Sequence, residues 1–461
     1  MPNNLSVRES GRLQATIQTQ IPPTARRHVW LDVLRGVAVL AVLFEHLLDP
    51  LFPEVRAAVS PWFDFGQYGV MVFFLISGYV VPASLERRGS VAGFWVGRLF
   101  RLYPLWIVAA VLGTVFGLVQ VYSALPGQLG ERPVVAGLAH LTMLQDFLQV
   151  VSVVNVFWTL SYEMVFYLLV TAIFVLWPRR AGATGTLTVA MAGVLLGGAL
   201  PAGALSHALG GDIVVVGVTA VLAAGLAGIV LGGRRVRLCG AAALAVLAIV
   251  LLAVNSRIGA WQSLAIVATM FAGTALYRLD QGQLLWRRTG PIVALVPVVC
   301  VAAAIWFGPG WSMADQQAQA FRWGWSAAVV GAWLTFGIGR LLRSVALPRF
   351  LVRLGLISYS VYLLHPLVVQ VLRRLVPYPD QVSLPGRIAW SVVLLGVVVG
   401  CSALGYRFVE RPAQELGRRL ARSAARKERA PGDPYTQQQQ KVSRTAPWRV
   451  VRERLGRPGP Y

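Results

Sequence analysis

Long apolar segments recur along the whole chain, and they constrain its fold more than any other feature of the sequence. A helix needs about 20 apolar residues to cross the hydrocarbon core of a bilayer, whereas a transmembrane strand needs only about 10 and alternates in polarity. Twelve segments have the helical length and lack the alternation. They lie near residues 30–49, 68–84, 102–121, 157–177, 184–205, 212–232, 237–254, 259–277, 290–307, 324–342, 355–373 and 387–409. The pattern therefore predicts an all-α fold, a polytopic integral membrane helical bundle with about 10–12 transmembrane helices.

The composition excludes the common alternatives. Hydrophobic residues make up 56% of the 461 positions and charged residues only 13%, whereas an average soluble domain is about 25% charged. Such a chain has too few charged side chains to cover a folded surface in water, so a soluble globular enzyme is excluded. Disorder over most of the chain is excluded as well, because disordered segments combine low hydrophobicity with high charge.

Positive charge predominates, with 42 Lys and Arg against 19 Asp and Glu and a formal net charge of +23. In a soluble protein this excess would suggest nucleic acid, but in a membrane protein Lys and Arg concentrate in the cytoplasmic loops. When the N-terminus is placed inside and the segments alternate, most basic residues fall on the cytoplasmic side, with Arg373 and Arg374 as the local exception. We therefore expect a multi-pass protein of the cytoplasmic membrane with both termini inside and no nucleic-acid partner.

The chain is expected to divide into three parts. Residues 1–29 form a polar cytoplasmic lead, residues 30–410 hold the transmembrane segments, and residues 411–461 form a basic cytoplasmic tail. The tail contains turn-forming Pro-Gly and Asp-Pro pairs and a run of glutamines, so we expect it to be disordered and attracted to anionic lipid. The longest external connection, 122–156, contains an apolar stretch that we expect to be re-entrant or interfacial.

Ionisable residues inside an apolar segment are costly, and they therefore indicate functional sites. The first segment carries Asp32, Arg35, Glu45 and His46. Arg35 and His46 are eleven residues apart, which places them on one face of a helix and about 16 Å apart along its axis. Asp32 precedes Arg35 by one turn and is expected to neutralise part of its charge. Two interpretations stay open: the side chains form a site, or Arg35 reaches the interface while His46 satisfies a structural hydrogen bond.

Two further segments carry ionisable residues at informative positions. Arg98 and Arg101 stand three residues apart before the third segment, so they can face one way and grip phosphate groups. The alternative is an ordinary positive loop. Glu163 lies in the fourth segment, with Tyr167 one turn further on. A carboxylate inside a span needs a partner such as His46 or an arginine, in a site or in a purely structural pair.

A late segment brings three polar side chains to one helical face. Ser358, Tyr362 and His365 stand at positions i, i+4 and i+7, so they line a cavity or form a polar seam between helices. In the second segment, Gly69 and Gly78 permit the close approach of a neighbouring backbone. The sequence has no cysteine or histidine spacing typical of a metal site, and it has no phosphate-binding or dinucleotide loop.

Taken in order, these motifs resemble those of the membrane-bound acyltransferase family three, the multi-spanning O-acyltransferases of bacteria and some animals. The matching pieces cover most of the chain and follow the family's order. They are Leu31–Gly36 with His46, Gly69–Gly78, Arg98–Arg101 with Tyr103 and Pro104, Phe157–Leu160 with Glu163, Ser358–Tyr359 with Tyr362 and His365, and Glu410–Pro412. Each piece is weak alone, but several pieces in one order are specific.

The resemblance implies an enzyme that transfers an acyl group, usually acetyl, from acyl-CoA to a hydroxyl group, commonly on a sugar. The family's essential arginine and histidine fall on Arg35 and His46. Its arginine pair on the acyl-CoA side falls on Arg98 and Arg101. The family core has about ten spans, so twelve segments imply either additions or over-counting.

Roles for the site residues follow from the resemblance and from the chemistry of the side chains. We expect His46 to act as general base, oriented by Glu163 or Glu45, while the arginines hold CoA phosphates or polarise the thioester. The expected catalytic residues are His46, Arg35 and Glu163; the expected acyl-CoA-binding residues are Arg98, Arg101 and Arg35; the expected substrate-lining residues are Glu45, Ser358, Tyr362 and His365. Acetyl-CoA is the expected donor, and no metal is expected.

The acceptor and the class of protein leave alternatives open. The acceptor is an exported glycan or a lipid-linked sugar, or else a cytoplasmic secondary metabolite such as a glycosylated macrolide, which some family members acylate. A secondary transporter is the alternative from another class, because twelve spans with internal termini fit one. Transporter folds often contain repeats, however, and no similarity is evident between residues 30–205 and 212–409.

Overall fold

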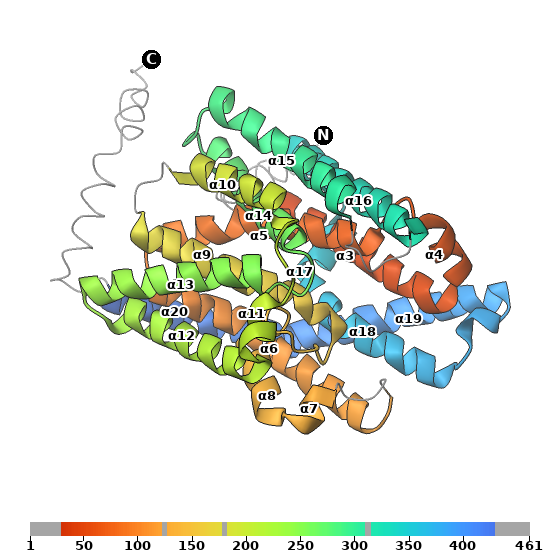
Figure 1. Ribbon diagram of the computed structural model, residues 1–461. Coiled ribbons are helices and arrows are strands. Elements are labelled where there is room, and N and C mark those ends of the chain that lie inside the picture. Colours follow the sequence, from red (N-terminus) through yellow and green to blue (C-terminus); the bar gives the residue numbers. More distant parts are fainter. Residues whose placement is uncertain (1–28, 122–126, 178–181, 309–314, 429–461) are drawn as a thin grey trace, which may run out of the picture.

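The computed structural model describes residues 29–121, 127–177, 182–308 and 315–428, and every regular element in these ranges is helical (Figure 1). In chain order the elements are α3 (Val29–Leu51), α4 (Pro53–Val59), α5 (Phe65–Arg88), α6 (Val91–Leu118), α7 (Gly127–Glu131), α8 (Pro133–Leu141), η1 (Asn155–Phe157), α9 (Trp158–Leu176), α10 (Ala183–Gly197), α11 (Ala204–Leu209), α12 (Gly211–Leu231), α13 (Arg234–Val254), α14 (Ala260–Asp280), α15 (Trp286–Phe307), α16 (Asp315–Leu341), η3 (Leu342–Ser344), α17 (Arg349–Leu356), α18 (Ser358–Leu375), η4 (Pro379–Gln381), α19 (Leu384–Gly405), η5 (Tyr406–Glu410) and α20 (Arg411–Glu428). The long helices lie side by side in one bundle (Figure 1). The predicted all-α bundle is confirmed.

Each of the twelve predicted segments corresponds to a helix or a helix pair. Nine helices in the described ranges are long and apolar enough to cross a membrane, and the bent pair of α17 and α18 makes a tenth span if it is counted as one. The two remaining segments are α3 and α10. The helix α3 carries too many ionisable side chains to be counted among the nine apolar helices, and α10 is apolar but shorter than they are. The helix that departs most from a plain membrane span is therefore the one that carries Arg35 and His46.

The segment predicted near 355–373 is confirmed as α18, which is continuous from Ser358 to Leu375. The short helix α17 precedes it and meets it at an angle of 72°, a bend that the sequence pattern did not indicate. Gly355 explains part of the geometry, because α17 crosses α3 so closely that a Cβ on this glycine would collide with the backbone carbonyl of Asp32. This crossing fixes the start of α3, where Arg35 lies, against the bend that leads into α18.

The long connection that follows α6 folds back into the bundle. Its α8 helix leads into a loop whose Leu144 and Phe147 side chains are fully buried. His140 fastens this loop: one ring nitrogen lies 2.8 Å from the carbonyl oxygen of Ala136, and the other accepts a hydrogen bond from the Val153 N–H at 3.2 Å. Burial lowers the pKa of His140, which favours the neutral ring that this acceptor role requires. The connection thus packs against the start of α9, which positions Glu163.

The C-terminal part of the helical bundle differs from the expected tail. The chain continues from α19 through a π-helical turn, η5, into α20, so residues 411–428 are an ordered helix rather than the start of a disordered segment. Gly417 and Ala421 are buried against α6, while the arginines of α20 lie on its exposed side. The Glu428 carboxylate closes the contact by accepting a hydrogen bond from the Ser90 hydroxyl at 2.5 Å. The high overall charge of this segment led to the prediction of disorder, whereas the segment forms an amphipathic helix. The rest of the predicted tail, and the predicted lead before residue 29, lie outside the described residues.

Candidate functional site

The first helix of the described chain holds the two residues on which the sequence argument rests. Because α3 is continuous from Val29 to Leu51, Arg35 and His46 keep the predicted separation of about three helical turns. The Arg35 guanidinium donates a hydrogen bond to Asp32 Oδ1 at 2.7 Å. The predicted neutralisation of Arg35 by Asp32 is therefore confirmed.

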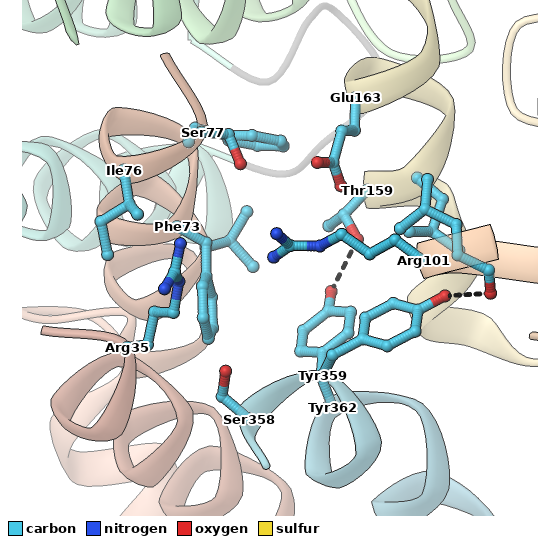
Figure 2. A pocket seen from close by; sticks show the side chains of 14 residues that line it. Arg35, Phe73, Ile76, Ser77, Arg101, Thr159, Glu163, Ser358, Tyr359 and Tyr362 are labelled. Atoms are coloured by element: carbon cyan, nitrogen blue, oxygen red, sulfur yellow. Dashed lines mark hydrogen bonds between the residues drawn. The ribbon is translucent and has the colours of Figure 1, made fainter. Parts of the chain in front are cut away.

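A pocket of about 90 Å³ lies between α3, α5, α6, α9 and α18 (Figure 2). Arg35 and Arg101 point into it from two sides, and Glu163 lies beside Arg101 (Figure 2). Its lining residues are Arg35, Val70, Phe73, Phe74, Ile76, Ser77, Arg101, Leu102, Thr159, Leu160, Glu163, Ser358, Tyr359 and Tyr362. The structure thus brings together five of the residues predicted from sequence: Arg35, Arg101, Glu163, Ser358 and Tyr362.

Charged groups enter this pocket from opposite sides. Arg35, Arg101 and Glu163 lie close enough to interact electrostatically with one another. The Glu163 carboxylate accepts a hydrogen bond from the Tyr167 hydroxyl. No hydrogen bond joins the Arg101 guanidinium to another residue of the described ranges, so its N–H donors are available to a ligand.

Arg98 takes a different position from Arg101. Its side chain is only 7% exposed, and it donates a hydrogen bond to the Ser84 hydroxyl at 3.1 Å. Its guanidinium stacks on the rings of Phe94 and Tyr167, with centroid distances of 5.3 and 5.2 Å. Arg98 is not among the pocket-lining residues, so the two arginines that were expected to face one way do not share a cavity: Arg101 lines the pocket, and Arg98 stacks on Tyr167.

His46 lies outside the pocket lining, at the far end of α3. Its Nδ1 lies 2.9 Å from the carbonyl oxygen of Val42, which assigns the proton to Nδ1 and leaves a lone pair on Nε2. The His46 ring packs edge-on against the ring of His365, with 4.7 Å between the centroids and an interplanar angle of 80°. A neutral imidazole with this tautomer can accept a proton on Nε2.

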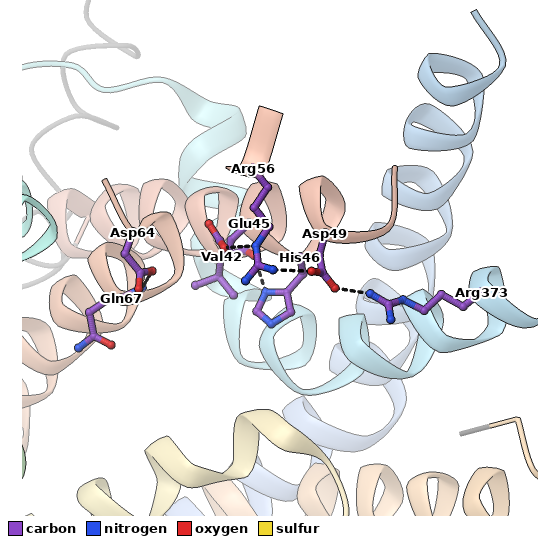
Figure 3. A network of polar contacts seen from close by, with 8 residues as sticks. All are labelled: Val42, Glu45, His46, Asp49, Arg56, Asp64, Gln67 and Arg373. Atoms are coloured by element: carbon purple, nitrogen blue, oxygen red, sulfur yellow. Dashed lines mark hydrogen bonds and ion pairs between the residues drawn. The ribbon is translucent and has the colours of Figure 1, made fainter. Parts of the chain in front are cut away.

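Glu45 and Glu163 do not provide the expected orienting contact with His46. Glu45 accepts a hydrogen bond from Arg56 Nε at 3.0 Å, toward the exposed side of the helix end (Figure 3). Glu163 instead accepts its hydrogen bond from Tyr167. Adjacent helical residues point about 100° apart, so Glu45 turns away from His46. The backbone carbonyl of Val42 supplies the contact that was expected from a carboxylate.

An ion network covers the end of α3 near His46 (Figure 3). Arg56 bridges Glu45 and Asp49, and Arg373 from α18 forms a second ion pair with Asp49. Arg373, the exception to the predicted charge distribution, therefore has an acidic partner. Nearby, Asp64 accepts a hydrogen bond from the Gln67 N–H at 2.7 Å, and burial raises the pKa of its carboxyl group.

The polar face of α18 links the pocket to the histidine pair. Ser358 and Tyr362 line the pocket, and the Tyr362 hydroxyl accepts a hydrogen bond from Thr159 Oγ1 at 3.1 Å. The Tyr362 ring lies 6.0 Å from the ring of His365, centroid to centroid. The predicted face of Ser358, Tyr362 and His365 is confirmed, and it runs from the arginines to His46.

Several residues near the pocket were not singled out from the sequence. Tyr359 lines the pocket and donates a hydrogen bond to the Leu102 carbonyl at 2.8 Å. Ser77 and Thr159 line it from motifs that were noted for other residues. Glu410 accepts a hydrogen bond from the Ser360 hydroxyl at 2.7 Å and is 4% exposed. Only its place in a family motif drew attention to Glu410. Within the described ranges, no group of three His, Cys, Asp or Glu side chains is arranged to hold a metal ion.

The fold and this site define a polytopic membrane protein with a cationic pocket and a histidine pair contributed by two helices, α3 and α18. A family model described as an acyltransferase domain matches residues 28–407. The chain therefore belongs to this acyltransferase family, the one that its motifs resemble, and it is an O-acyltransferase. The membership favours an acyltransferase over the secondary transporter considered from the sequence.

Curated relatives agree with the family. "Acyltransferase MdmB" of Streptomyces mycarofaciens is 26% identical over 92% of this chain and 100% of the relative. "Nodulation protein 10" of Rhizobium leguminosarum bv. viciae is 30% identical over 35% of this chain and 48% of the relative. A putative O-acetyltransferase of Staphylococcus aureus strain COL is 36% identical over 18% of this chain and 13% of the relative. No solved structure matches the chain significantly.

Proposed function

We propose that the protein moves an acyl group, most simply acetyl, from acyl-CoA to a hydroxyl group of a carbohydrate or of another glycosylated acceptor. The observation that carries the proposal is the convergence of Arg35 and Arg101 on one pocket, in which the Arg101 donors have no hydrogen-bond partner among the described residues. Guanidinium groups match the geometry of phosphate oxygens and bind them strongly. Acyl-CoA is an acyl donor that carries phosphates.

The size of the pocket indicates which part of the donor it takes. A volume of about 90 Å³ holds several waters but is too small for a nucleotide, since a buried water needs only about 10–15 Å³ by a comparable measure. We infer that Arg35 and Arg101 bind a single phosphate at the start of the pantetheine arm. The arm would then follow Tyr362 toward His46. An axial offset of about 16 Å between Arg35 and His46 suits this long, thin arm.

His46 has the tautomer that a general base needs. In the proposed reaction its Nε2 removes the proton of the acceptor hydroxyl, and the acceptor oxygen attacks the carbonyl carbon of the thioester. A carbon–oxygen bond forms and the carbon–sulfur bond breaks. The sulfur of CoA leaves with the proton that His46 had taken, so His46 returns to its neutral form. This direct transfer needs no covalent intermediate on the enzyme.

The side from which each substrate arrives follows from the proposed orientation. With both termini in the cytoplasm, as the distribution of Lys and Arg favours, the His46 end of α3 faces outward. An exported glycan or lipid-linked sugar is then the natural acceptor. A cytoplasmic glycosylated metabolite, such as a macrolide sugar, is the alternative. Mass spectrometry of surface glycan and culture extract from a deletion strain decides between them, because only the pool that contains the acceptor loses its acyl groups.

The proposal is tested with the purified full-length protein in detergent or proteoliposomes. Acetyl-CoA turnover is measured with an acceptor taken from the pool that the deletion strain identifies, for the wild type and for His46→Ala. We expect transfer by the wild type and a rate at least about 100-fold lower in the variant at equal amounts of folded protein. Full activity in His46→Ala would overturn the assignment of the base, and absence of any transfer from acyl-CoA by the wild type would overturn the donor.

A further inference from the structure

The ring of His365 has an unusual environment. The side chain is completely buried, and its Nδ1 lies 3.0 Å from the carbonyl oxygen of Val361, one turn back on α18. This contact places the proton on Nδ1 and a lone pair on Nε2, as in His46. The Nε2 atom has no hydrogen-bond partner within the described part of the chain.

A buried nitrogen without a partner calls for an explanation. Nearly all buried polar atoms in proteins are hydrogen-bonded, and the explanations for an exception include strain, a bound water and a catalytic role. The other buried helical histidine, His140, provides a direct contrast, since both of its ring nitrogens have backbone partners. A purely structural role would be expected to satisfy His365 in the same way.

The neighbour of His365 suggests what the lone pair is for. His46 lies edge-on to it at 4.7 Å between ring centroids, and the two rings are held in that relation by separate helices, α3 and α18. No carboxylate among the described residues is hydrogen-bonded to His46. When His46 takes the acceptor proton it becomes a cation, and a neutral polar ring packed against it at this distance can stabilise that charge.

We propose that His365 is a positioning residue for His46: its ring fixes the orientation of the His46 imidazole, and its Nε2 lone pair stabilises the imidazolium that forms during transfer. The inference rests on the proposed function, because it requires His46 to be the base. The proton stays on His46 until the sulfur of CoA takes it, so His365 is unchanged over the cycle.

The test distinguishes the effect of the shape of the His365 ring from the effect of its Nε2 acceptor. His365→Phe keeps a ring but removes the acceptor, whereas His365→Gln returns an acceptor at a similar distance from the backbone. We expect His365→Phe to lower kcat by about 10- to 100-fold, with KM for acetyl-CoA and for the acceptor changed by less than about threefold. We expect the kcat of His365→Gln to be about tenfold higher than that of His365→Phe. Activities are expressed per amount of folded protein, which is measured by size-exclusion chromatography.

The matched control is His140→Phe, which removes a buried helical histidine whose nitrogens are both satisfied. We expect it to lower the yield or Tm while kcat per folded molecule stays within about threefold of the wild type. If His365→Phe does not yield folded protein, His365→Leu takes its place in the comparison with His365→Gln.

Three results would overturn the inference. One is wild-type kcat in His365→Phe, one is a Gln variant no better than Phe, and one is a loss confined to the KM of the acceptor, which would make His365 a substrate ligand. Each differs from failure of the proposed function, which would appear as absent turnover in the wild type or as full activity in His46→Ala.

Discussion

The two ends of α3 are built for different tasks. At one end Arg35 is paired with Asp32 and faces a pocket in which the Arg101 hydrogen-bond donors have no partner among the described residues. At the other end His46 lies against a second imidazole, under a partly exposed ion network. The comparison teaches that, in the proposed mechanism, charge recognition and proton chemistry are separated along one helix. A substrate that engages both ends must be long and thin.

Removing the imidazole at the His46 end of α3 gives the largest expected effect. In His46→Ala we expect kcat to fall by about 10²- to 10⁴-fold, because general base catalysis contributes that much. Binding of acetyl-CoA, measured by calorimetry, is expected to stay within about threefold of the wild type. A parallel loss of acetyl-CoA binding would show that the two ends are not independent.

Removing the Arg101 guanidinium, near the Arg35 end of α3, is expected to weaken the binding of acetyl-CoA. In Arg101→Ala we expect KM for acetyl-CoA to rise by about 10- to 100-fold, since a hydrogen bond to a charged group contributes about 1.5–3 kcal/mol. Arg101→Lys, which keeps the charge but loses the planar fork, is expected to fall between Ala and the wild type. Unchanged KM in both variants, by steady-state kinetics, would argue against a phosphate at this end.

Arg98 provides a sharper version of the same comparison, because it is three residues from Arg101 but buried between two aromatic rings. We expect Arg98→Ala to reduce the free energy of unfolding by about 1–3 kcal/mol, through lost stacking and packing. The folded fraction is expected to keep a KM for acetyl-CoA within about threefold of the wild type. Thermal unfolding in detergent and steady-state kinetics check the two parts. If KM for acetyl-CoA rises as much in Arg98→Ala as in Arg101→Ala, both arginines bind the donor, as the sequence led us to expect.

The ion network near His46 is expected to contribute least. The Arg56 side chain is 45% exposed, and exposed ion pairs contribute only about 0.2–1 kcal/mol. Arg56→Gln is therefore expected to lower Tm slightly and to leave kcat within about twofold of the wild type. A large fall in kcat, with Tm unchanged, would mean that the network takes part in the proton chemistry.

The sequence predicted the helices well and the contacts between them less well, for physical reasons. The length of an apolar segment is a local property, so all twelve segments were located. The bend before Ser358 depends on the close crossing of Gly355 with α3, which no local pattern reports. The helix at 411–428 was missed because a charge count ignores which face each arginine occupies.

The same limit applies to the site. Helical spacing correctly placed Arg35, Ser358 and Tyr362, since residues on one helix have fixed relative positions. The contact between His46 and His365 joins residues on two helices far apart in the sequence, and the stacking of Arg98 on Tyr167 depends on the packing of α6 against α9. Contacts of this kind are set by packing, which a single sequence does not specify.

The π-helical turn between α19 and α20 has a consequence for the coupling of the C-terminus to the site. A π-turn accommodates one residue more than the α-helix around it, so it sets the rotational phase of everything that follows. Deleting one residue from Tyr406–Glu410 would rotate α20 by about 100°. Gly417 would then leave α6, and Glu410 would leave Ser360 on the helix that carries His365. The register of this turn therefore couples the packing of α20 on α6 to α18, the helix that carries His365.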